Sequence, residues 1–196
     1  MTLIKKLKQR RDILEKRISA LKKSFDFKQG EYGPTKRQLD KLKGFVLLCH
    51  AEIEDYFESV ATMLIENSYK TWREKHRSDY VLTCFLLRHN KLDKNLTVDN
   101  AIFELKKDYL KNISNNHGIR PSHVHGLFYP LGYDDKDFSV TLISELDSLG
   151  SSRGEIAHIA SYKATGIMDK ETVYKKIDAI IKELEDFESA IIHNIK

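Results

Sequence analysis

The sequence has few of the residues that interrupt or cross-link a chain. Its 196 residues include three prolines, nine glycines and two cysteines. The scarcity of turn-forming residues favours long helices over many short strands. No stretch of useful length alternates polar and apolar residues with the period of two that a half-buried strand requires. The sequence therefore predicts an all-α fold without internal repeats.

The sequence also lacks long apolar runs and paired cysteines. No run approaches the roughly 20 apolar residues that cross a bilayer. The N-terminal segment contains acidic residues and resembles neither a secretory signal nor a transit peptide. Cys49 and Cys84 lie in apolar stretches without metal-ligand spacing, which indicates free, buried thiols. We therefore expect a cytoplasmic protein that has no contact with membranes and needs neither metal nor cofactor.

The sequence is rich in charged residues. Charged residues make up 32% of the chain and hydrophobic residues 41%, with a formal net charge of +4. That composition is typical of an ordered globular protein, and its positive charge permits a polyanionic partner such as RNA.

Residues 1–26 form a predicted basic amphipathic helix, followed by a helical bundle domain over residues 27–196. Apolar residues recur every three or four positions, and Arg11 is the only polar member of that stripe. Three interpretations remain open: a helix folded back on the body, a coiled-coil dimer arm, or a basic arm that contacts RNA. In the last case the predicted RNA-binding residues are Lys5, Lys6, Arg10, Arg11 and Arg17.

Further helices follow from periodicity and capping residues. We expect a long central helix over residues 35–76, a helix capped by Ser78, one opened by Thr97 or Asp99 and ended near Gly118, and a last helix capped by Asp169. Residues 119–137 are expected to form short turns or a single helical turn. A short helix is expected to stop at Gly150, and a new one to begin at Ser151 or Ser152.

The segment around Arg153 and His158 carries the most chemical information. Ser152 and Glu155 have the spacing of a capping box, which predicts Arg153 at the first position of a helix. A helix N-terminus and a guanidinium together would bind phosphate well. An imidazole five residues later could exchange protons.

On one helix these two side chains do not point to the same atom. Five residues at about 100° per residue place them roughly 140° apart around the helix axis. Two copies of the helix crossing at a twofold axis would bring two arginines and two histidines around one cleft. Small residues that would allow such close approach are Gly154, Ala157, Ser161 and Ala164. The alternative is an arginine at a helix start and a hydrogen-bonded histidine, without chemistry.

Four segments resemble the RiboL-PSP-type group of the HEPN superfamily, whose motif is R-x(4–6)-H. They are Cys49–Tyr56, Asn116–Ile119, Pro130–Asp134 and Leu146–His158. The resemblance covers about residues 35–195 and leaves the N-terminal helix outside. It implies an antiparallel helical bundle that forms a homodimer and is often an endoribonuclease of antiviral defence or toxin–antitoxin systems, with an antitoxin or sensor protein as a possible partner.

The expected reaction is metal-independent cleavage of single-stranded RNA by its own 2′-hydroxyl, with Arg153 and His158 as catalytic residues. Supporting residues would be Glu54, which could orient His158, together with Ser152, Glu155 and Tyr162. One alternative is a non-catalytic HEPN module that binds RNA or a protein. Gly154 favours it, because many active members have a polar residue there. Another alternative is a helical assembly protein.

Three neighbouring histidines, His117, His123 and His125, lack a further ligand at metal-binding spacing. They are therefore expected at the surface or at the rim of a dimer interface.

Overall fold

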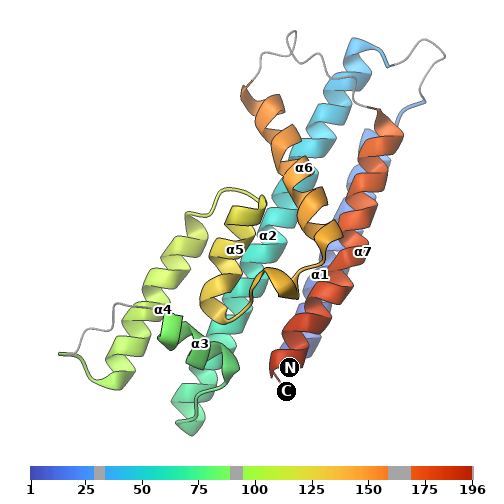
Figure 1. Cartoon of the computed structure of the whole chain (residues 1–196). Helices are drawn as coiled ribbons and strands as arrows, with labels where there is room; N and C mark the ends of the chain where they lie inside the picture. Colours follow the sequence, from blue (N-terminus) through green and yellow to red (C-terminus); the bar gives the residue numbers. More distant parts are fainter. Residues whose placement is uncertain (29–33, 89–94, 159–168, 196) are drawn as a thin grey trace.

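The computed structural model describes residues 1–28, 34–88, 95–158 and 169–195, and at residues 157 and 158 the backbone without the side chains. Over these residues the chain forms α-helices and two short 3-10 helices, η1 and η2, and no strand (Figure 1). The elements are α1 (Leu3–Phe25), α2 (Lys36–Lys75), α3 (Tyr80–Arg88), α4 (Val98–Ser114), α5 (Pro121–Phe128), η1 (Tyr129–Leu131), η2 (Asp135–Asp137), α6 (Val140–His158) and α7 (Lys170–Ile195). The predicted all-α fold is confirmed.

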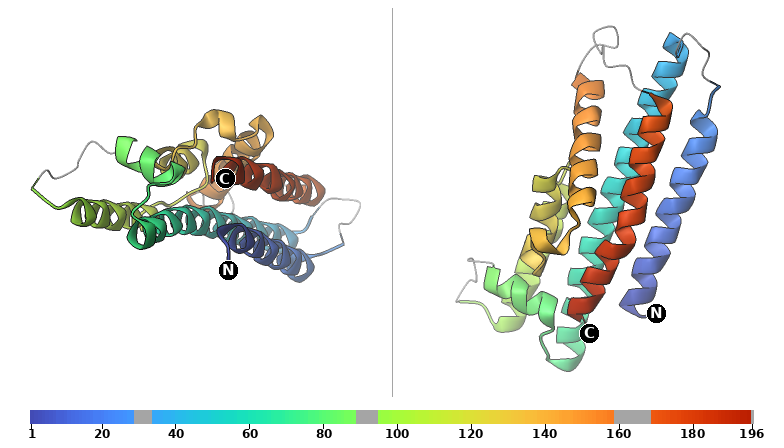
Figure 2. Two further views of the ribbon diagram at one scale, coloured as in Figure 1. Left: turned by 90° about the horizontal axis from the view of Figure 1, so that it is seen from below. Right: turned by 45° about the vertical axis from the view of Figure 1, so that its right-hand side comes forward.

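Four of these helices form an antiparallel bundle. Helices α1, α2, α6 and α7 lie side by side with alternating directions, so that the start of α1 and the end of α7 meet at one end (Figure 2). Helices α3, α4 and α5 lie beside α2 on the side away from α1 (Figure 1). The 40 residues of α2 span about 60 Å, which is long enough to contact both groups.

Side-chain caps fix the starts of several helices, and two of them, at Thr97 and Asp169, are those that the sequence predicts. Thr35 and Gln38 form a capping box at the start of α2, and His76 ends it in the left-handed conformation at φ 49°. Thr97 caps α4. Asp169 accepts a hydrogen bond from the Thr172 N–H at 2.8 Å before α7. These caps use residues three apart, and local sequence therefore suffices to find them.

Two smaller expectations are wrong. The cap of α3 is Asp79, which accepts from the Leu82 N–H at 2.9 Å, while Ser78 bonds to the Thr83 hydroxyl instead. Helix α4 ends at Asn115 rather than at a left-handed Gly118. Among the described glycines only Gly132 has a positive φ.

The expected break at Gly150 is also wrong, because α6 is one helix through residues 150–152. The Ser152 hydroxyl does not cap a helix; it donates to the Ser148 carbonyl one turn earlier, at 2.9 Å. Glu155 lies exposed on the helix rather than in a capping box. Helix α6 buries Leu142, Leu146 and Leu149. Burial of three leucines outweighs the penalty of about 1 kcal/mol for a glycine inside a helix.

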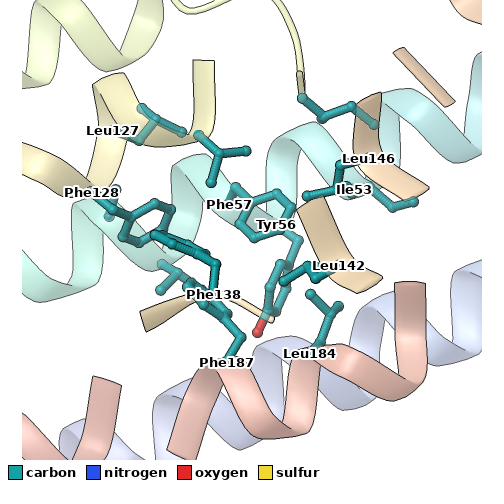
Figure 3. Close-up of a cluster of buried hydrophobic side chains, with 14 of the residues drawn as sticks. Ile53, Tyr56, Phe57, Leu127, Phe128, Phe138, Leu142, Leu146, Leu184 and Phe187 are labelled. Carbon is teal, nitrogen blue, oxygen red and sulfur yellow. The ribbon is translucent and has the colours of Figure 1, made fainter. Parts of the chain in front are cut away.

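An aromatic cluster in the core holds α5, α6 and α7 against α2 (Figure 3). The ring of Phe187 lies 5.1 Å from Phe128, 5.4 Å from Phe57 and 5.4 Å from Phe138, measured between centroids. These rings come from α7, α5, α2 and the segment before α6. The cluster therefore fixes the relative positions of the helices that carry the candidate site.

Helix α1 is folded back on the bundle, as the first of the three interpretations held. Its apolar stripe buries Leu7, Leu14 and Ile18 against α2 and α7. At the polar position of that stripe, the Arg11 Nε lies 3.2 Å from a carboxylate oxygen of Glu188. The same carboxylate accepts a hydrogen bond from the Tyr56 hydroxyl at 2.8 Å. This buried network sets the register of α1.

The predicted RNA-binding residues of α1 divide into two groups. Arg10 pairs with Asp55, and Arg17 lies 2.7 Å from Glu52. With Arg11, three of the five are thus engaged with acidic side chains of the bundle, whereas Lys5 and Lys6 are exposed. Among the described helices, none is both long and apolar enough to cross a membrane.

Candidate active site

One face of α6 carries Gly150, Arg153 and Gly154, which stand three and four residues apart and so lie together on the helix surface. Arg153 lies inside α6, more than three turns from its first residue. The sequence-based picture of a phosphate cradle at a helix N-terminus is therefore wrong. Arg153 is half-buried and instead borders a cavity.

That cavity has a volume of about 300 Å³. Its walls come from α2, from the segment that joins α4 to α5, from α5 itself and from α6. The lining residues are His50, His117, Gly118, Ile119, Arg120, His123, Gly150, Arg153 and Gly154. The volume lies at the small end of the range of roughly 300–1,000 Å³ for ligand sites, and most of the lining side chains are polar.

The Arg120 side chain lies along the glycine face of α6. A Cβ atom added to Gly150 would stand 2.7 Å from the Arg120 Cγ, and one added to Gly154 would stand 3.8 Å from its Nη2. The first distance is a clash and the second an ordinary contact. Gly150 therefore makes room for the stem of Arg120, and the guanidinium ends beside Gly154 and close to Arg153.

His50 forms the buried wall of the cavity. Burial lowers the pKa of His50 to about 4, and the positive charges of Arg153 and His123 add to this effect. His50 is therefore neutral at pH 7. Its Nδ1 lies 3.5 Å from an Oε2 of Glu54, one turn along α2.

Glu54 and Glu58 of α2 face the segment before α5. The Gly118 N–H lowers the pKa of Glu54, and the side chain of Asn116 lowers that of Glu58. Asn116 also donates to the Gly118 carbonyl at 3.2 Å. Burial raises the pKa of Glu54, and the charge of Arg153 opposes that rise. The polar stripe of α2 thus positions the His117–Arg120 wall of the cavity.

The two guanidiniums at the cavity have no acidic partner in the part of the chain that the structure describes. Within the described residues, neither Arg120 nor Arg153 makes an ion pair within 4 Å, whereas Arg10, Arg11 and Arg17 on α1 all do. Glu54 acts on Arg153 only at longer range. The cavity therefore carries an excess of positive charge that suits an anion.

Part of the predicted site lies outside the described residues. His158 is the last residue of α6, and its side chain is not among those described; Ser161, Tyr162 and Ala164 fall in residues 159–168. The proposed contact between Glu54 and His158 stays a prediction.

The three neighbouring histidines separate in the structure. His117 and His123 line the cavity, while the ring of His125 stacks on Tyr129 at 4.8 Å. In the described part of the chain, no three His, Cys, Asp or Glu residues are arranged to hold a metal ion. Sequence reasoning named these histidines but missed Arg120, whose only local signal is its position before Pro121 at the start of α5.

Comparison with protein families places the chain beside a known group. The profile of the RiboL-PSP-HEPN family matches residues 5–193 and so includes nearly all of α1, which the sequence resemblance had left outside. No match was found among curated proteins or solved structures.

Proposed function

The chain belongs to the RiboL-PSP-HEPN family, whose members are commonly ribonucleases, and from this we propose that it is a metal-independent endoribonuclease. The substrate is single-stranded RNA, and Arg153 and His158 are the catalytic residues. The observation that carries the proposal is the half-buried Arg153, which has no ion-pair partner among the described residues and lies beside a cavity rich in imidazoles. A guanidinium held in this way can bind a phosphodiester and stabilise its transition state.

The reaction follows from these residue types. His158 takes the proton of the RNA 2′-hydroxyl, whose oxygen attacks the adjacent phosphorus. The partner's His158 gives a proton to the departing 5′-oxygen, and Arg153 from each protomer stabilises the negative charge of the phosphorane. The products end in a 2′,3′-cyclic phosphate and a 5′-hydroxyl. DNA lacks the attacking hydroxyl and is not cleaved.

The proposed active form is a homodimer. Arg153 and His158 are five residues apart on a regular helix, so their backbone positions lie about 140° apart around the helix axis. Two copies of α6 facing each other would complete a cleft with both residue types. Family membership also supports a role in antiviral defence or as a toxin, with an antitoxin or sensor protein as partner.

Cleavage of a labelled RNA in the presence of EDTA tests the proposal. We expect cleavage by the wild type, and a loss of about 10²–10⁴-fold in kcat for His158→Ala. Arg153→Ala should also lose turnover. The matched controls are His193→Ala and Arg77→Ala, both exposed and far from the cavity, and they should cleave normally. Binding without cleavage by the wild type would favour the non-catalytic module, and cleavage that needs a metal would contradict the mechanism.

A further inference from the structure

Arg120, His117 and His123 belong to no part of the R-x4-H motif, yet they share a cavity with Arg153. They come from a different segment, and Gly118 and Asn116 of that segment face Glu54 and Glu58 of α2. We propose that this cavity is a phosphate-binding subsite within each protomer, which holds a phosphate of the RNA strand next to the cleaved bond. This inference rests on the RNA substrate of the proposed function.

Charge supports an anionic ligand. Arg120 and Arg153 both end at the cavity without an ion-pair partner among the described residues. A guanidinium presents a planar fork of N–H groups that binds two phosphate oxygens at once. Among the described residues, Glu54 acts on Arg153, but it is not part of the cavity lining and makes no ion pair within 4 Å with either arginine.

Packing supports a preformed site. The stem of Arg120 lies against Gly150, where a Cβ would stand 2.7 Å from its Cγ. The His123 ring is fixed in a similar way, because a Cβ at Gly118 would stand 3.1 Å from two of its atoms. Two glycines thus leave room for the two side chains that would contact the ligand. Such preorganisation reduces the entropy lost on binding.

Size and polarity identify the ligand class. A cavity of about 300 Å³ suits one nucleotide unit rather than a protein segment. Among the described lining residues only Ile119 is large and apolar, so these walls offer little surface to a lipid or an apolar side chain. His117 and Arg120 are exposed, so the cavity opens to solvent and is accessible to an RNA strand.

The test measures binding of a fluorescent 2′-O-methyl oligoribonucleotide, which lacks the free 2′-hydroxyl and is not cleaved. Arg120→Gln should weaken its Kd about tenfold or more, since one charge-assisted contact is lost. The plot of log K against log salt should lose about 0.7 of its slope, the value for one phosphate contact on a single strand. Arg77→Gln, which removes an exposed guanidinium at the far end of α2, is the matched control and should change neither quantity.

Folding and catalysis are controlled separately. If Arg120→Gln melts well below the wild type, Arg120→Lys serves as the second test of binding. Lysine keeps the aliphatic stem and the positive charge but lacks the planar guanidinium. This variant should therefore bind the oligonucleotide several-fold more weakly than the wild type. Wild-type affinity in both Arg120 variants, or an equal loss in Arg77→Gln, overturns the subsite. In cleavage assays Arg120→Gln should raise KM and change kcat little. A protein that binds through Arg120 but cuts no RNA would refute the ribonuclease and leave the subsite standing.

Discussion

Two glycines one turn apart on α6 should respond oppositely to alanine. Gly154→Ala adds a methyl group at an ordinary contact distance, 3.8 Å from the Arg120 Nη2. Replacing glycine by alanine inside a helix stabilises the folded state by about 0.5–1 kcal/mol. For a protein of this size that gain raises Tm by roughly 1–4 °C. The benefit arises only if α6 is helical at this position.

Gly150→Ala gains the same backbone term, but its methyl group would stand 2.7 Å from the Arg120 Cγ. Arg120 must take another rotamer, so the gain should vanish or reverse, and oligonucleotide binding should weaken as in Arg120→Gln. Thermal melts followed by circular dichroism, together with the binding assay, measure both effects. A drop in Tm for Gly154→Ala, or equal stabilisation by both variants, would refute the packing described for Arg120.

Three other predictions concern the network under α1, the acid side of the stability profile and the dimer. Arg11→Met should lower the free energy of unfolding in urea by about 3 kcal/mol, because it leaves the buried Glu188 carboxylate without a cationic partner. Adding Glu188→Leu should recover most of that loss. If it recovers none, the network described for Arg11 and Glu188 is contradicted. The pKa of His50 is about 4 in the folded state and 6.5 in the unfolded state. Between these two pH values the unfolded state binds a proton that the folded state does not bind. The stability of the fold should therefore fall as the pH drops from 6.5 to about 4. In His50→Gln this fall should be smaller, and an unchanged profile would count against the buried neutral imidazole. Mixed dimers of Arg153→Ala and His158→Ala subunits should recover partial cleavage, whereas complete inactivity would argue against a shared site.

Much of the fold could be predicted from the sequence because its signals are local. The caps at Thr35, Thr97 and Asp169 act over three residues, and the apolar stripe of α2 repeats along one helix. The continuity of α6 could not be predicted in this way. Gly150 makes room for the side chain of Arg120, which lies thirty residues earlier in the chain. The local sequence does not distinguish a glycine that ends a helix from one that allows close packing inside a helix.

The candidate site could likewise be predicted from the sequence only in part. Arg153 was found from its motif, but its setting was not, since Ser152 and Glu155 have the spacing of a cap without forming one. Arg120 was missed because it reaches the cavity only when α5 packs against α6. The stripe formed by His50, Glu54 and Glu58 on α2 was visible as a helical pattern. Its contacts with the turn before α5 depend on tertiary structure.

The most direct test of the proposed reaction is a single change in the substrate. A labelled RNA is first cut by the wild-type protein in EDTA to locate one cleavage position, and the same RNA is then made with one 2′-deoxy nucleotide on the 5′ side of that bond. The account predicts that cleavage at this bond disappears while cuts elsewhere continue, and that wild-type products end in a 2′,3′-cyclic phosphate. Cleavage that persists at the 2′-deoxy position would contradict attack by the 2′-hydroxyl and with it the assigned roles of Arg153 and His158.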